Sequence, residues 1–205
     1  MTPSREAWHA FLRSRRSVRR FAPRPVPREV LTRVLDTARW APSAHNRQPW
    51  RFVVLEAEGA ARRALAQAMA DAFRRDLEAD GLPEAEIAAR VQRARQRLLE
   101  APVAVLLAAD RATMDPYPDE RRRQAEYTML IQSAALAGLQ LLLAAHAEGL
   151  AGVWTCGPLF VPDLVRQVLD LPATWEPQAM FYLGYPARIP PPPPRLPLDA
   201  LVQWR

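Results

Sequence analysis

The stretch YTMLIQSAALAGLQLLLAAHA, Tyr127–Ala147, contains no Asp, Glu, Lys or Arg and is about long enough to cross a bilayer. Two observations argue against a membrane span. Gln132, Ser133, Gln140 and His146 interrupt the run, and the sequence holds no second segment of this kind. A helix that is apolar on all sides is also what a soluble protein buries at its centre. We therefore predict a buried central helix and no membrane association.

The segments on either side of this helix alternate between helical and strand patterns. Apolar residues at helical spacing predict helices over 4–15, from Pro27 to a stop at Pro42, and over 60–80, 83–100 and 163–171. Aromatic and β-branched runs predict strands over 50–57, 102–110, 150–156 and 178–185, with loops over 113–123 and 157–162. Helices come first, and strands interleaved with helices follow. This order predicts an α+β sandwich with one sheet between helical layers.

Composition limits the class of protein. The 205 residues suit one domain, 1–205, whose proline-rich segment 186–205 should be extended. With Cys156 as the only cysteine, an intramolecular disulfide is impossible, and no Cys and His spacing predicts a zinc site. We expect a cytoplasmic protein, because the charged N-terminus lacks the apolar stretch of a signal peptide. The net charge of +6 comes from arginines spread among acids, which does not favour nucleic-acid binding.

Two polar segments carry the candidate chemistry. Arg15–Phe21 (RRSVRRF) follows a predicted helix, and guanidinium and hydroxyl groups there suit a phosphate. Ala41–Trp50 (APSAHNRQPW) lies between a helix and a strand, and its amides and hydroxyls match the hydrogen-bonding edge and ribityl chain of a flavin. Taken separately, the first could be a solvated helix end and the second an ordinary connection.

Together and in this order, the two segments resemble the nitroreductase-like flavin mononucleotide (FMN) enzymes. The pattern is R-x-S-x-R/K-x-F followed by P-S-x-x-N-x-Q-P-W, and the similarity continues through the central helix, a G-L-x-x-x-W-x-x-G region and a C-terminal R-L-P. The chain also resembles, more loosely, the flavin domain used in biosynthesis of the deazaflavin coenzyme. The resemblance implies a three-layer sandwich with a mostly antiparallel sheet, and a homodimer with the long helix at its interface.

The resemblance also implies roles for individual residues. Arg15 and Ser17 would bind the FMN phosphate, Arg19 would reach the pyrimidine edge, and Arg16 would contact the cofactor by side chain or backbone. Arg195 would close over the phosphate from the C-terminal segment. Many relatives have a second cation two residues before this arginine, where this chain has a proline.

The remaining implied contacts come from two loops. Pro42, Ser43 and Ala44 would approach the flavin of the other subunit, and Asn46 and Gln48 match polar positions of the motif. The backbone amides of Cys156 and Gly157 would face the flavin. We expect Cys156 itself to be buried and unreactive and His45, next to Ala44, to be an ordinary loop histidine. No protein side chain is predicted to be a catalytic acid, base or nucleophile, and no metal is expected.

The implied activity is transfer of hydride from NADH or NADPH through FMN to a small organic acceptor, such as a nitroaromatic, a quinone, an enone or a deazaflavin-type compound. We expect residues 114–120 and the helix pair 60–100 to select the acceptor. The alternative is a flavin- or deazaflavin-binding protein that acts in biosynthesis or sequestration without nicotinamide turnover.

Overall fold

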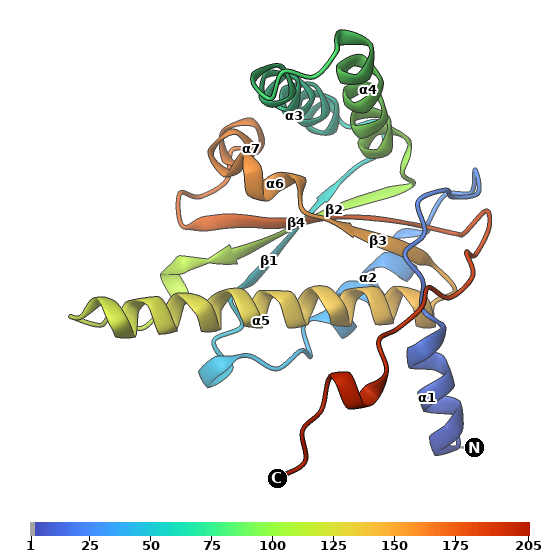
Figure 1. Cartoon of the computed structure of the whole chain (residues 1–205), viewed down its shortest axis with the longest axis vertical. Coiled ribbons are helices and arrows are strands. Elements are labelled where there is room, and N and C mark those ends of the chain that lie inside the picture. The colour runs from blue at the N-terminus through green and yellow to red at the C-terminus, as the bar shows by residue number, and fades with distance from the viewer. Residues whose placement is uncertain (1–2) are drawn as a thin grey trace.

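The computed structural model describes residues 3–205 and has one antiparallel sheet at its centre (Figure 1). The strands follow the order β1-β2-β4-β3, with the bounds β1 Trp50–Leu55, β2 Val103–Asp110, β3 Ala151–Thr155 and β4 Trp175–Gly184. All three neighbouring pairs are antiparallel. Every residue of β2 is buried, because this strand lies inside the sheet and both of its faces are covered by helices.

Helices form a layer on each face of the sheet. One layer holds α2 (Arg28–Ala38) and the long α5 (Glu120–Ala147), and the other holds α3 (Ala60–Ala79), α4 (Glu84–Glu100), α6 (Gly157–Phe160) and α7 (Pro162–Leu169) (Figure 1). α1 (Arg5–Ser14) lies at one end, and short 3-10 helices cover Ala44–Asn46, Arg111–Thr113 and Leu198–Ala200. The three-layer α+β sandwich expected from the sequence is confirmed.

Alternating residues of the inner strands supply the two cores. Val105 and Leu107 of β2 pack with α2 and α5, whereas Ala104 and Leu106 pack with α3, α4 and α7. This division follows from the strand geometry, in which successive side chains point to opposite faces of the sheet. Both helical layers are thus anchored on the same strand.

α5 is the central helix that the apolar stretch predicted, and it begins at Glu120, seven positions before that stretch. Asp119 caps its start by accepting a hydrogen bond from the Arg122 amide at 2.9 Å. Among the helices of residues 3–205, α5 alone has the length and hydropathy of a membrane span, and 50% of its most apolar window is buried. From Glu126 onward one side of α5 is buried against the sheet, so it is a core helix.

α5 approaches the sheet most closely at Gly138. A β-carbon on this residue would collide with the indole ring of Trp154 on β3 and would lie 2.9 Å from Cζ of Phe181 on β4. The two rings themselves pack edge to face, with centroids 4.9 Å apart. The absence of a side chain at position 138 therefore sets the distance between helix and sheet.

Two elements differ from the sequence expectations. The expected loop 157–162 contains α6, a single helical turn that begins directly after β3. The last strand begins at Trp175 rather than at residue 178, and it includes Pro177. The pairing of β2 with β4 shifts between Leu107 and Ala108, the residue opposite Pro177, and a proline that cannot donate to the ladder is tolerated at such an irregularity.

We predict that Gly138→Ala lowers the free energy of unfolding by about 1–3 kcal/mol, because the added methyl group overpacks the contact with Trp154. Intrinsic helix propensity alone would favour alanine. Urea denaturation followed by circular dichroism measures the effect. In a Trp154→Phe background the same change should cost less, and a Gly138→Ala protein as stable as the wild type would contradict this account.

Candidate functional site

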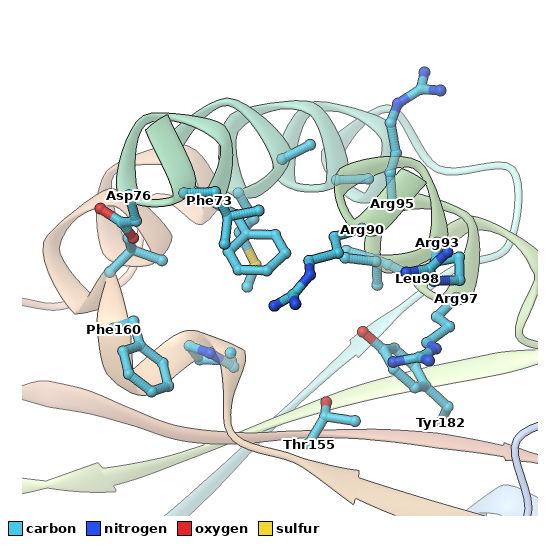
Figure 2. Close-up of a pocket in the computed structure, with 18 of the residues that line it drawn as sticks. Phe73, Asp76, Arg90, Arg93, Arg95, Arg97, Leu98, Thr155, Phe160 and Tyr182 are labelled. Carbon is cyan, nitrogen blue, oxygen red and sulfur yellow. The ribbon is translucent and has the colours of Figure 1, made fainter. Parts of the chain in front are cut away.

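A cavity of about 770 Å³ opens between the α3–α4 hairpin and the end of β3 (Figure 2). Met69 and Phe73 of α3 and Phe160 of α6 supply apolar walls, and Thr155 and Tyr182 form the floor on the sheet. Burial raises the pKa of Tyr182, so its hydroxyl stays protonated and can donate a hydrogen bond. The cavity suits a flat, largely apolar molecule held by a few polar groups.

Gly157 brings backbone to the edge of this cavity. It is the first residue of α6, so no helical carbonyl accepts a bond from its amide. A β-carbon on Gly157 would lie 3.1 Å from Cε of Met69, and the glycine leaves that space open. Its neighbour Cys156 is exposed, so the expectation of a buried cysteine is wrong. The chain leaves the sheet at this residue, and no neighbouring strand covers it.

The arginine-rich segment lies at the other end of β3. The Val18 amide donates a hydrogen bond to the Gly152 carbonyl at 3.1 Å, and Ser17 forms an isolated parallel β-bridge with Gly152. These contacts fix the position of the segment. Arg15 is half-buried, whereas Ser17 and Arg19 are exposed. Strand residues advance about 3.3 Å each, so Ser17 and Gly157 lie at opposite ends of β3, roughly 15 Å apart. That separation is comparable to the length of an extended FMN molecule.

His146, near the end of α5, anchors the helix that precedes this segment. Its ring stacks on Phe11 with centroids 4.9 Å apart, and its Nε2 lies 2.7 Å from Oγ of Ser14. Burial, followed by the charges of Arg15 and Arg16, lowers the pKa of His146. The imidazole is therefore neutral at physiological pH and adds no charge beside the arginines.

Arg16 is used locally. Its Nη1 donates to the carbonyls of Arg13 and Arg15, at 2.6 and 2.9 Å, and so caps the end of α1. A cofactor contact of Arg16 would have to come from its backbone or from the other two guanidinium nitrogens, Nε and Nη2.

The polar loop 42–49 lies on the opposite side of the sheet from the cavity, beside α5. Ser133 of α5 accepts a hydrogen bond from the Ala44 amide at 3.2 Å, and Ser43 accepts one from the Gln48 amide at 3.0 Å. Pro42, Ser43 and Ala44 also border a hollow of about 220 Å³ over Met129, Gln132 and Leu136. Within one chain, the structure therefore does not bring this loop together with the cavity or with Arg15–Arg19.

This loop holds a strained backbone. His45, Asn46 and Gln48 have φ angles of 51°, 53° and 49°, a region that costs most residues about 1 kcal/mol or more. Asn46 and Gln48 are exposed, and the side chain of Gln48 reaches back to the Asn46 carbonyl at 3.4 Å. Backbone held in such conformations often marks a functional site.

The loop 114–119 supports the polar loop and does not line the cavity. Arg47 forms an ion pair with Asp115, and this hydrogen bond lowers the pKa of Asp115. The Asp115 amide in turn donates to Glu126 Oε1 at 3.1 Å. Of the two regions expected to select an acceptor, the helix pair of residues 60–100 lines the cavity of the same chain, and the 114–120 segment does not.

The C-terminal segment is extended, as its prolines predicted, and runs past one end of α5 (Figure 1). The side chain of Arg195 is exposed and donates only to the carbonyl of Pro194, at 3.3 Å, within the part of the chain that the structure describes. Within residues 3–205, no group of His, Cys, Asp and Glu side chains is arranged to hold a metal ion.

Comparison with known proteins identifies the family. The family model described as "Nitroreductase family" matches residues 12–185, most of the chain. The chain belongs to the nitroreductase family. This assignment confirms the resemblance carried by the two polar segments, whereas the deazaflavin subgroup stays a prediction.

Proteins with similar sequences and structures match almost the whole chain. The NADH dehydrogenase of Thermus thermophilus is 34% identical over 93% of this chain and 92% of its own. The 5,6-dimethylbenzimidazole synthase of Rhodospirillum rubrum is 32% identical over 89% of this chain and 83% of its own. A Desulfovibrio desulfuricans protein crystallised with FMN has a TM-score of 0.75 and 26% identity, with coverage of 100% and 98%.

Sequence reasoning missed the residues that shape the cavity in this member of the nitroreductase family. Tyr182 stands within an apolar strand pattern, and Met69 and Phe73 belong to an ordinary amphipathic pattern, so nothing in the sequence separates them from core residues. One signal was available in α4, where Arg90, Arg93 and Arg97 share a helix face with the apolar Ala94.

Proposed function

We propose that this chain, over residues 1–205, is one FMN-binding domain of an oxidoreductase that transfers hydride from NADH or NADPH to a small organic acceptor. The observation that carries the proposal is the free backbone amide of Gly157 at the edge of an apolar cavity, at the opposite end of β3 from Arg15, Ser17 and Arg19. Family membership and the names of the relatives, one an NADH dehydrogenase and one crystallised with FMN, support it.

The residues present fit FMN. Arg15 and Ser17 offer a cation and a hydroxyl for the phosphate at the start of β3, and Arg195 would add a second cation from the C-terminal segment. At the other end, the amides of Cys156 and Gly157 offer donors to a planar ring, and the glycine lets the ring approach closely. Arg15 and Arg19 make no ion pair with a carboxylate of residues 3–205, which leaves them available for an anion.

When bound, FMN supplies the hydride chemistry. The family resemblance assigns Arg19 to the pyrimidine edge of the ring, where its positive charge would favour the reduced form. Gly157 orients the ring through its amide, and the walls formed by Met69, Phe73 and Phe160 exclude water from the side where the second substrate lies. No side chain has to act as a nucleophile.

The working unit in this proposal is a homodimer. Gln132, Leu136 and Leu139 form an exposed stripe on α5, with Leu136 and Leu139 at 43% and 48% exposure, next to the strained loop 42–48. Association of two copies along this stripe would cover it and would offer Pro42, Ser43, Ala44, Asn46 and Gln48 to the flavin of the partner. We place the dimer in the cytoplasm, where the exposed thiol of Cys156 would stay reduced.

The acceptor is proposed as a class, namely a nitroaromatic, quinone, enone or deazaflavin-type compound that fits between Phe73 and Phe160. A second candidate function is biosynthetic use of a flavin or deazaflavin without nicotinamide turnover. The relative named 5,6-dimethylbenzimidazole synthase favours this alternative. Steady-state oxidation of NADH or NADPH with any acceptor separates the two.

We predict that the purified protein is yellow, carries FMN and is bleached by NADH or NADPH under anaerobic conditions. Absorbance near the flavin bands provides the measurement, and heat-released cofactor identifies FMN. A colourless protein that does not bind added FMN would overturn the proposal.

Replacing Arg19 with Gln should lower the flavin midpoint potential, because the reduced, more negative flavin loses a stabilising cation. A lost interaction of about 1.4 kcal/mol corresponds to a decrease of about 30 mV for a two-electron couple. Redox titration measures the potential. Arg20→Gln removes the same charge from the neighbouring residue and serves as the control. An unchanged potential in the Arg19 variant would contradict its role.

Leu136→Glu should separate the dimer, because it buries a carboxylate in the apolar interface, and the separated chains should lose FMN. Analytical ultracentrifugation measures the mass, and circular dichroism checks that the fold persists. Gln124→Glu adds the same charge to the exposed first turns of α5 and should leave the dimer intact. A Leu136→Glu protein that remains dimeric and yellow would show that the interface lies elsewhere.

A further inference from the structure

The wall of the cavity formed by α4 carries several arginines. Arg90, Arg93 and Arg97 are spaced three and four residues apart, so they share one face of the helix, and all three line the cavity. In Figure 2, Arg90 points into the cavity and Arg97 extends toward Tyr182 on the floor. Arg95, between them in sequence, also borders the cavity, but its guanidinium group points away from it in Figure 2. The positive charge inside the cavity therefore comes from a particular face of α4 and not from the general abundance of arginine.

The charges of these arginines are not equally compensated. Arg90 forms an ion pair with Glu86, one turn earlier in α4. Arg93 and Arg97 make no ion pair with any carboxylate of residues 3–205. The acids that line the cavity, Asp76, Asp80 and Glu86, lie toward the α3–α4 turn, and Asp76 is across the cavity from Arg97 in Figure 2. Glu86 and Arg97 are about 16 Å apart along the helix. The cavity thus has an acidic end and an uncompensated basic end.

The basic end also holds a hydrogen-bond donor. Tyr182 is 8% exposed, and burial raises the pKa of its hydroxyl, against smaller lowering effects of Thr155, Arg62 and Arg97. The Thr155 hydroxyl beside it donates to the Met180 carbonyl at 2.9 Å. Two guanidinium groups and a neutral phenol at one end of an apolar cavity are suited to phosphate or carboxylate oxygens. Met69 and Phe73 lie along the rest of the cavity and suit an apolar ring.

We propose that Arg93, Arg97 and Tyr182 bind the anionic group, phosphate or carboxylate, of the substrate that exchanges electrons with the flavin. The proposal rests on the function proposed above, because the substrate must lie in the cavity that Gly157 borders. It narrows the substrate class to a planar molecule with a negative charge at one end. The charge could belong to the acceptor or to the 2′-phosphate of NADPH, and one set of variants distinguishes these sources.

The test compares Arg93→Gln/Arg97→Gln with Arg95→Gln, which removes a charge from the same helix at a residue whose guanidinium group points away from the cavity. The probes are 4-nitrobenzoate and 4-nitrobenzamide, which differ in charge and hardly in shape, together with NADPH and NADH. Calorimetric titration of the FMN-loaded protein gives binding constants, and steady-state rates give KM. The double variant should bind 4-nitrobenzoate about tenfold or more weakly and 4-nitrobenzamide nearly as before. Arg95→Gln should alter neither.

Each outcome decides the proposal. If the double variant has a higher KM for NADPH and an unchanged KM for NADH, the proposal is supported and the site binds the 2′-phosphate of the electron donor. The proposal is overturned if the wild-type protein binds 4-nitrobenzoate and 4-nitrobenzamide with equal affinity and also has the same KM for NADPH and NADH. Weaker FMN retention in the double variant, with substrate affinities unchanged, also overturns it, because the arginines would then serve the flavin phosphate. If the wild type binds 4-nitrobenzoate selectively but shows no turnover, the function proposed above fails and the anion site stands.

Discussion

The contact between Gly138 of α5 and the rings of Trp154 and Phe181 is the constraint on which the rest of the structure depends. It seats the longest helix directly on β3 and β4. Trp154 is three residues before Gly157, so the same contact that closes the core also fixes the position of the backbone amide at the cavity. His146, two turns further along α5, then holds α1 and the arginine segment against the start of β3. One helix thereby positions both ends of the proposed flavin site.

The sheet separates the proposed site into two parts. The cavity and Gly157 lie on the face covered by α3 and α4, whereas the strained loop 42–48 lies on the α5 face. A loop that is strained, exposed and far from the cavity of its own chain has no evident use within that chain. In a dimer, the loop would contact the flavin of the second copy. The positive φ angles of His45, Asn46 and Gln48 are therefore a physical argument for a shared site, in addition to the family resemblance.

Much of this could be predicted from the sequence, because periodicity and proline positions determine most helices and strands. α1 begins at the predicted N-terminal end of its pattern, where Ser4 accepts a hydrogen bond from the Ala7 amide at 3.2 Å, and α3 and α4 end within a residue or two of their predicted limits. The exposure of Cys156 and the local capping by Arg16 could not be predicted, since each depends on how the chain leaves a helix or strand. The position of Tyr182 at the cavity could not be predicted either, because a strand pattern does not show which buried side chain borders a cavity.

The α3–α4 hairpin is inserted between two strands that are direct neighbours in the sheet. β1 ends at Leu55, opposite Ala104 near the start of β2, so a short turn could join them and the sheet would keep its order. Residues 56–102 are thus an insertion that the strand order does not require, but Leu65 and Leu98 within it pack in the core with Ala104 and Leu106 of β2. A hairpin transplanted between relatives can in this way refit the cavity wall and keep the strand order, provided that it preserves the core contacts on β2 and the space beside Gly157 that Met69 borders.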